Sequence, residues 1–174
     1  RLDQPGSPSA ALAASLTDSL TSVAPTIVGN RCLIAGSQSL WATNGVTTTK
    51  LSDITVDFDG FTVAGGIAYF SAAPAASGDA RPTNFELWKS DGTPQNTVRI
   101  KDIVAGDSGS FPTELTPDGN LVYFRAQVAD GTDKLWVTDG TDKGTKQLPY
   151  PAQAVSEPNG LKLLSNAQIG RAHV

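Results

Sequence analysis

Histidine, cysteine and methionine are almost absent from this sequence, and their scarcity excludes several kinds of chemistry. Of the 174 residues, none is methionine, one is cysteine and one is histidine. Because the only histidine is His173, the sequence contains no Ser-His-Asp or Cys-His arrangement and no histidine-based metal site. Cys32 lies in an apolar run, where a small buried side chain is expected rather than a reactive thiol. We therefore predict no catalytic residue, no metal site and no cofactor for this chain.

Strong charge and long apolar runs are also missing. The formal net charge is −4 and the charged residues are scattered, so the sequence has neither a nucleic-acid footprint nor a basic membrane-binding face. No apolar stretch approaches the roughly 20 residues that a membrane helix needs. The single cysteine leaves the redox compartment open. In contrast, 17 glycines and 11 prolines fit a chain with many turns.

The most informative feature that is present is an internal repeat. The three tryptophans each follow a leucine, and they are 47 and 48 residues apart. An Asp-Gly-Thr turn follows the second and third tryptophan, whereas the first copy reads Asn44-Gly45-Val46. A period of this length is typical of an array in which each unit is one supersecondary element. The structural repeat positions are Trp41, Trp88, Trp136, Asp91, Gly92, Asp139 and Gly140.

The runs between the turns predict strands. Short β-branched and aromatic runs alternate with Asp-Gly, Asn-Gly and Gly-Thr, which supply the positive φ of tight hairpins. One unit gives about four strands, and four short antiparallel strands per unit are typical of a β-propeller blade. We therefore expect an all-β fold, a partial β-propeller-like array of about three and a half blades. The expected strands of one unit include residues 67–70, 86–88, 98–103 and 113–116.

The expected organisation has three parts. Residues 18–168 form the propeller-like repeats, with units around the three tryptophans and a fourth unit that starts at Asn159. Residues 1–17 are rich in Ser, Ala and Pro, and we expect a linker or a decayed preceding blade there. A signal peptide is the weaker alternative, because no basic start precedes the short apolar stretch.

One run resembles a known family. Glu86-Leu87-Trp88-Lys89-Ser90-Asp91-Gly92-Thr93, followed by Asp102-Ile103, is similar to the ELWxxDGT-type repeats of large bacterial proteins, sometimes described as hyalin-like. The resemblance covers residues 30–165, and the first unit departs from it because Asp and Thr of the turn are replaced. It implies a propeller-like array in secreted or surface-exposed bacterial proteins, with no common catalytic residues.

The last six residues carry a different resemblance. Residues 169–174, Ile-Gly-Arg-Ala-His-Val, can be encoded by the start of a common sequencing adapter whose next triplet is a stop. We expect these residues to be a non-native tail on a fragment that was cut inside a repeat. Since propellers usually need four to eight blades to close, neighbouring blades of a parent protein are expected partners.

Two motifs permit a functional interpretation beside a structural one. Asp130 with Asp133, and Asp139 with Asp142, could donate oxygens to Ca²⁺, but an Asp before Gly more often accepts hydrogen bonds from its own turn. The tryptophans could form a sugar-stacking platform, but one per unit at an equivalent position favours packing between blades.

The connection between residues 71 and 85 departs from the repeat and is the candidate binding loop. It is longer than its counterparts and holds Asp79, Arg81 and Asn84, and repeat insertions often collect on a binding face.

We expect a non-catalytic binding or display scaffold at the cell surface or outside the cell, with an unknown protein or glycan as partner. The alternatives are a propeller hydrolase or lyase whose catalytic residues lie outside this chain, and a carbohydrate-binding propeller.

Overall fold

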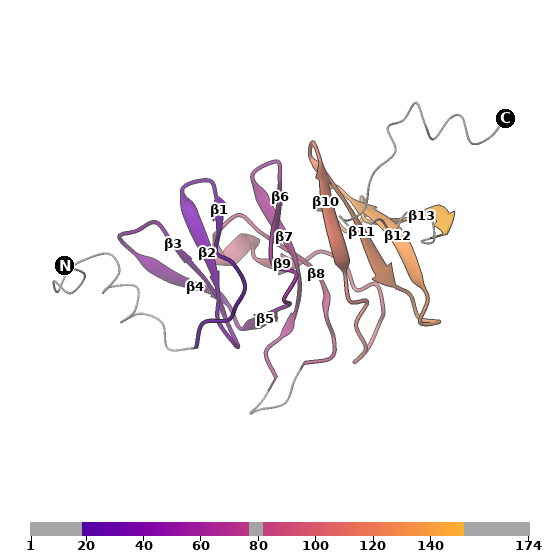
Figure 1. The fold of residues 1–174 in the computed structure, drawn as a ribbon, viewed down its shortest axis with the longest axis horizontal. Coiled ribbons are helices and arrows are strands. Elements are labelled where there is room, and N and C mark those ends of the chain that lie inside the picture. Colours follow the sequence, from indigo (N-terminus) through magenta and orange to yellow (C-terminus); the bar gives the residue numbers. More distant parts are fainter. Residues whose placement is uncertain (1–18, 77–81, 152–174) are drawn as a thin grey trace.

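The computed structural model describes residues 19–76 and 82–151. This part of the chain is all-β and consists of three antiparallel sheets that stand side by side in chain order (Figure 1). The predicted fold class, antiparallel sheets in a partial propeller-like array, is therefore confirmed for the described residues. The expected segments 1–17 and 169–174, and the half unit from Asn159, lie outside them.

Each sheet is a meander of consecutive strands. The first sheet consists of β1 (Thr26–Val28), β2 (Arg31–Ala35), β3 (Leu40–Thr43) and β4 (Thr48–Ser52). The second consists of β5 (Ile54–Val56), β6 (Thr62–Ala64), β7 (Ile67–Pro74), β8 (Glu86–Ser90) and β9 (Val98–Arg99), with a short 3-10 helix, η1 (Pro94–Asn96), before β9. The third consists of β10 (Thr113–Asp118), β11 (Leu121–Gln127), β12 (Asp133–Thr138) and β13 (Lys146–Pro151).

The three tryptophans occupy the same register in their sheets. Trp41 is paired with Ile34, Trp88 with Phe70 and Trp136 with Phe124 across the two central strands. Side chains alternate between the two faces of a strand. All the remaining equivalent positions of the three sheets therefore also face the same way.

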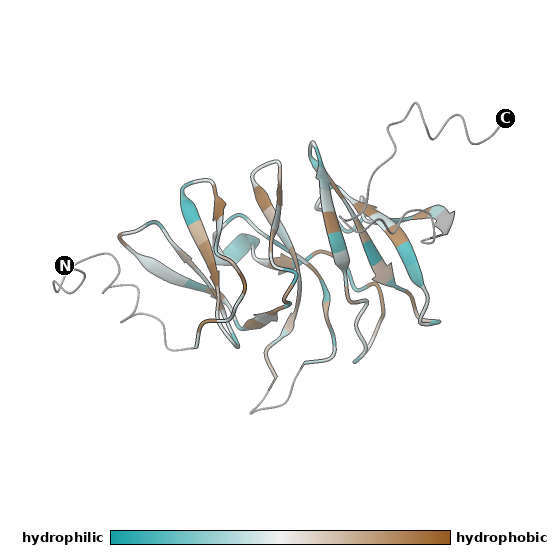
Figure 2. Cartoon of the chain, in the orientation of Figure 1, coloured by the Kyte–Doolittle hydropathy of each residue, from teal (hydrophilic) through white to brown (hydrophobic). Residues whose placement is uncertain are grey.

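Two apolar cores fill the spaces between neighbouring sheets. Leu33 and Leu40 of the first sheet meet Phe70 of the second, and all three are fully buried. Leu87 of the second sheet meets Phe124 of the third in the same way. Both faces of the second sheet are therefore covered, as in stacked sheets. Figure 2 shows apolar and hydrophilic residues alternating along the strands of the third sheet.

Three strands differ from the sequence-based expectation. The strand expected at 67–70 extends as β7 to Pro74, so residues 71–74 of the connection expected at 71–85 belong to the sheet. The strand expected at 98–103 is only Val98–Arg99, because the backbone N–H groups of Ile103 and Val104 donate to the Glu86 carboxylate instead of a neighbouring strand. The first strand of the second sheet is divided into β5 and β6, which both pair with β7 on either side of a turn at residues 57–61.

Candidate functional site

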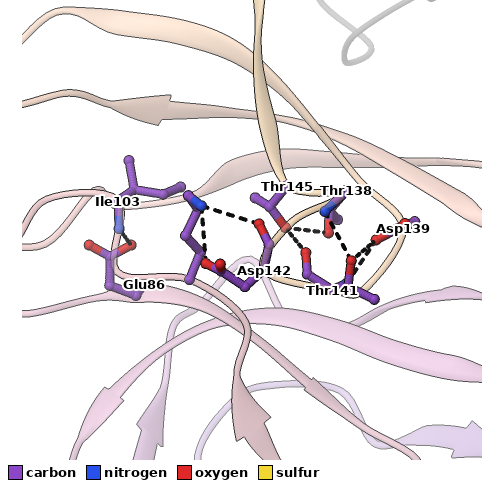
Figure 3. A network of polar contacts seen from close by, with 9 residues as sticks. Glu86, Ile103, Thr138, Asp139, Thr141, Asp142 and Thr145 are labelled. Atoms are coloured by element: carbon purple, nitrogen blue, oxygen red, sulfur yellow. Dashed lines mark hydrogen bonds and ion pairs between the residues drawn. The ribbon is translucent and has the colours of Figure 1, made fainter.

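The Asp-Gly-Thr turn of the third sheet is held by a compact set of hydrogen bonds (Figure 3). Asp139 Oδ1 accepts from the backbone N–H of Thr141 at 2.8 Å and from its hydroxyl at 2.7 Å. Gly140 N–H donates to Thr138 Oγ1 at 2.9 Å, and the hydroxyls of Thr138 and Thr145 are 2.7 Å apart. Thr138 and Thr145 are buried, so the turn is tied to the sheet from within.

The second sheet contains the same hydrogen-bond set. Asp91 Oδ1 accepts from Thr93 N–H at 2.9 Å and from its hydroxyl at 2.6 Å. Gly92 N–H donates to Ser90 Oγ at 3.0 Å, and Ser90 Oγ lies 2.8 Å from Thr97 Oγ1. The hydroxyl residue before the Asp and the threonine six residues after the Asp also belong to the motif, although neither is among the predicted repeat positions. Their signal is the matching pair of hydroxyl residues in both units.

In the first sheet an asparagine replaces the aspartate. Asn44 Oδ1 accepts from the N–H groups of Val46 at 3.0 Å and of Thr47 at 2.8 Å, and Gly45 N–H donates to Thr43 Oγ1 at 3.1 Å. The turn is shorter, but the carbonyl oxygen of Asn44 has the role of the carboxylate. A negative charge is therefore not required to form this turn.

The aspartate side chains of these turns accept hydrogen bonds from residues of the same turn. Hydrogen bonds from the Thr141 hydroxyl and backbone lower the pKa of Asp139, and those from Thr132 lower the pKa of Asp130. The other two carboxylates considered for Ca²⁺ are ion-paired, Asp133 with Arg125 and Asp142 with Lys101. Within residues 19–76 and 82–151 no group of three or more His, Cys, Asp or Glu side chains is placed to hold a metal ion.

The Asp-Gly-Thr turn also contacts the preceding sheet. Lys89 Nζ donates to the carbonyl oxygen of Gly140 at 2.7 Å, and Lys101 Nζ contacts both the carbonyl and the carboxylate of Asp142 at 3.2 and 3.0 Å. A β-carbon on Gly140 would lie 2.6 Å from the hydroxyl oxygen of Tyr69. The turn therefore fits closely against the second sheet, and glycine is needed there for space as well as for its φ of +86°.

Two of the three tryptophans lie in the spaces between sheets. Trp88 packs against the first core and Trp136, which is 8% exposed, belongs to the second. Trp41 points away from the first core; its indole Nε1 donates to Ser39 Oγ at 2.7 Å, and Lys50 Nζ lies 6.0 Å from its ring centre.

Of the three residues singled out in the candidate binding loop, the structure describes Asn84, since Asp79 and Arg81 lie outside the described residues. Its Nδ2 donates to the carbonyl oxygen of Gly106 at 2.6 Å. The neighbouring Thr83 hydroxyl donates to the carbonyl oxygen of Asp107 at 3.1 Å. The long connection between β7 and β8 therefore packs against the connection between β9 and β10, and the amide of Asn84 contributes to that contact.

A buried carboxylate organises the second of these two connections. Glu86 is 0% exposed and accepts hydrogen bonds from the backbone N–H groups of Ile103, Val104 and Ser110 at 3.1–3.2 Å, and from the Ser110 hydroxyl at 2.5 Å. Burial raises the pKa of Glu86, and the hydrogen bonds from Ser110, Val104 and Ile103 oppose that rise. In the sequence, Glu86 stands out only as the first residue of the repeat motif, and its partners could not be inferred because they lie 17–24 residues away.

The two connections also present an aromatic ring to solvent. Phe111 is 39% exposed and has a φ of +47°, an unusual value for a residue with a side chain. Its N–H donates to the carbonyl oxygen of Phe85 at 3.0 Å, and the two rings are 6.0 Å apart. A strained backbone that fixes an exposed ring is one of the features that cluster at binding sites.

Among residues 19–76 and 82–151, no helix is long and apolar enough to cross a membrane. A scan against protein-family models gives no match for this sequence, and a search of curated proteins gives none either. The resemblance to ELWxxDGT-type repeats therefore stays a prediction.

Proposed function

We propose that this chain is a non-catalytic binding or display scaffold, a propeller-like repeat segment of a larger secreted or surface bacterial protein. The observation that carries the proposal is the use of the motif residues. The Asp-Gly-Thr carboxylates of the second and third sheets bind their own turns, and Trp88 and Trp136 pack between sheets. The repeated residues therefore stabilise the sheets and turns, and the connections between strands are the part of the chain that we propose to bind a partner.

The region proposed to bind is formed by the two connections at one end of the second sheet. Thr83 and Asn84 join the β7–β8 connection to Gly106 and Asp107 of the β9–β10 connection. The buried Glu86 carboxylate holds the β9–β10 connection through its hydrogen bonds with Ser110. A loop that is held on a rigid framework loses less conformational entropy when it binds, which favours affinity.

A glycan partner is supported by one specific observation, the exposed ring of Phe111. Aromatic rings offer a flat apolar surface with little conformational entropy to lose, and Phe111 is held in place by its backbone and by Phe85. The secreted or surface location is supported by the resemblance of the repeat.

The proposal is tested by shortening the binding loop. Residues 75–82 are replaced by a Gly-Ser pair, which leaves Thr83 and Asn84 in place, and binding is measured on glycan arrays and on immobilised peptide libraries. We expect the unchanged protein to bind a defined set of ligands and the shortened variant to lose them, while both melt cooperatively. As a matched control, the exposed Val46 on the β3–β4 turn is changed to Ser, which should keep binding intact.

Two results would contradict the proposal. If the unchanged protein binds no glycan and no peptide, the scaffold has no binding role of the kind proposed. If the shortened variant binds as well as the unchanged protein, the binding site lies elsewhere. Loss of binding in Phe111→Ala on the glycan array alone would identify the carbohydrate-binding form of the proposal.

A further inference from the structure

The turn after β3 differs from the other two in having an asparagine directly before its glycine. Asn44 and Gly45 are both exposed to solvent. Because glycine has no β-carbon, another atom can approach its backbone nitrogen closely. The other asparagines of the described residues precede residues with a side chain; they are Asn30, Asn84, Asn96 and Asn120. Asn44 is therefore the described asparagine whose side chain can most easily meet the backbone nitrogen that follows it.

The Asn44 side chain is folded back along its own turn. Its Oδ1 accepts hydrogen bonds from the N–H groups of Val46 at 3.0 Å and of Thr47 at 2.8 Å, as in an Asx turn. Backbone N–H groups can only donate, so the atom that faces them is the oxygen. The small ring that the Val46 bond closes contains both Cγ of Asn44 and the backbone nitrogen of Gly45. The turn therefore keeps these two atoms close to each other.

The same two N–H groups favour attack on the Asn44 amide. When a nucleophile adds to an amide carbon, negative charge develops on the amide oxygen, and N–H donors that are already in place stabilise it. The donors of Val46 and Thr47 have this position at Oδ1. The Gly45 N–H donates to Thr43 Oγ1 at 3.1 Å, and the exposure of the turn lets a base from solvent remove its proton.

We propose that Asn44 and Gly45 form a self-modifying site, at which the asparagine loses its amide group as ammonia. The nitrogen of Gly45 adds to Cγ of Asn44, and the bond from Cγ to Nδ2 breaks. The proton lost from the Gly45 nitrogen is balanced by the proton that the leaving ammonia takes from solvent. Water then opens the cyclic imide at either carbonyl carbon, which gives aspartate or isoaspartate. Water is the only co-reactant.

The two products differ in how well they fit the turn. Aspartate at position 44 reproduces the Asp-Gly of the other two turns, where Asp91 and Asp139 accept from the backbone N–H two residues further on. Isoaspartate lengthens the main chain by one carbon and removes the side-chain oxygen from its donors, which disturbs the pairing of Thr43 with Thr48. Both products add a negative charge at the exposed end of the β3–β4 hairpin.

The site is tested by ageing the folded chain at mildly alkaline pH and mapping its tryptic peptides by mass spectrometry. Cleavage after Arg31 and Lys50 gives peptide 32–50, in which Asn44 is the only asparagine. This peptide should gain the mass difference between an amide and an acid. Part of it should also accept a methyl group from an isoaspartate methyltransferase. A sample that is digested without ageing corrects for reaction during the digest.

The other asparagines serve as internal controls. Peptides 90–99 and 102–125 contain Asn96 and Asn120, and their masses should stay unchanged over the same time. Asn44→Gln should abolish the mass change of peptide 32–50. An unchanged peptide 32–50 in the folded chain, or an equal mass change at all three asparagines, would overturn the proposal.

A matched variant separates the turn from the pair of residues alone. Leu121→Gly gives Asn120 the same following glycine, and among the described residues no N–H group donates to the Asn120 side chain. In the folded variant, Asn120 should react more slowly than Asn44, whereas in concentrated urea the two should react at similar rates. Equal rates in the folded variant, or a difference that persists in urea, would show that the turn does not drive the reaction. All these readouts are masses of the chain itself, so they are independent of the proposed binding function.

Discussion

Three glycines of the β-turns have the same backbone conformation but different surroundings, which makes them a graded series. Their φ values are +85° at Gly45, +86° at Gly92 and +86° at Gly140. Alanine at any of these positions should lower the free energy of unfolding by about 1–2 kcal/mol, because a β-carbon approaches the following carbonyl oxygen in the left-handed region. This cost is common to the series.

The surroundings add a second cost that differs between the three. A β-carbon at Gly140 would lie 2.6 Å from the hydroxyl oxygen of Tyr69, which is 3% exposed and belongs to the second core. Crowding of this kind typically costs a further ~1–3 kcal/mol. At Gly92 the nearest atoms are Cδ of Arg31 at 2.8 Å, which a change of rotamer can move away, and its Cβ at 3.2 Å, which must shift by less; at Gly45 no atom lies within 4 Å.

The expected order of destabilisation is therefore Gly140→Ala, then Gly92→Ala, then Gly45→Ala. Urea unfolding followed by tryptophan fluorescence gives the three values from the midpoints and slopes. Gly140→Val should cost more than Gly140→Ala, since a β-branched residue is still less compatible with a positive φ. Equal losses for Gly45→Ala and Gly140→Ala would refute the close fit between the third turn and the second sheet. The related glycine at Gly160 lies outside the described residues.

Substitutions at three further residues test other contacts. Trp88→Ala should lower the free energy of unfolding by about 3–5 kcal/mol, since its ring packs against the first core, and an unchanged melting temperature would contradict that packing. Asp139→Asn should be tolerated while Asp139→Ala lowers the melting temperature, because Asn44 Oδ1 in the first sheet also accepts from the backbone N–H two residues further on; similar melts for both variants would show that the oxygen is not needed. For Glu86, the pKa is higher in the folded than in the unfolded chain, so this group makes stability fall as pH rises from the ordinary glutamate pKa through the raised value. Glu86→Gln should remove that part of the pH dependence in urea titrations, and a variant with the same pH dependence as the unchanged protein would contradict the assignment.

The strand and turn pattern could be predicted from the sequence because it depends on local chemistry. Asp91-Gly92 and Asp139-Gly140 supply the positive φ that a tight turn needs, and the runs between turns have the period of a half-buried strand. These features require no knowledge of distant contacts.

The contacts between sheets could not be predicted in the same way. A period of two shows that Leu87 and Trp88 point to opposite faces, but not which neighbouring sheet each face meets. The partner of Asn84 lies 22 residues further along the chain, so its amide was assigned to a binding loop and its bond to Gly106 was not foreseen. The short β9 has the same explanation, because the carboxylate of Glu86 competes for backbone N–H groups that a strand would otherwise use.

The contact of the Asp-Gly-Thr turn of the third sheet with the preceding part of the chain has a consequence for how the array unfolds. Lys89 and Lys101 bind the turn of the third sheet, so this turn cannot open without breaking contacts of the second. Thr62 of the second sheet also donates to the carbonyl oxygen of Leu115 in the third. The free energy of such an array is a sum over units and nearest-neighbour interfaces, and strong interfaces make partly melted arrays rare. When one molecule of the chain is stretched in a force-extension experiment, it should therefore lengthen in a few large steps and not in one small step for each hairpin.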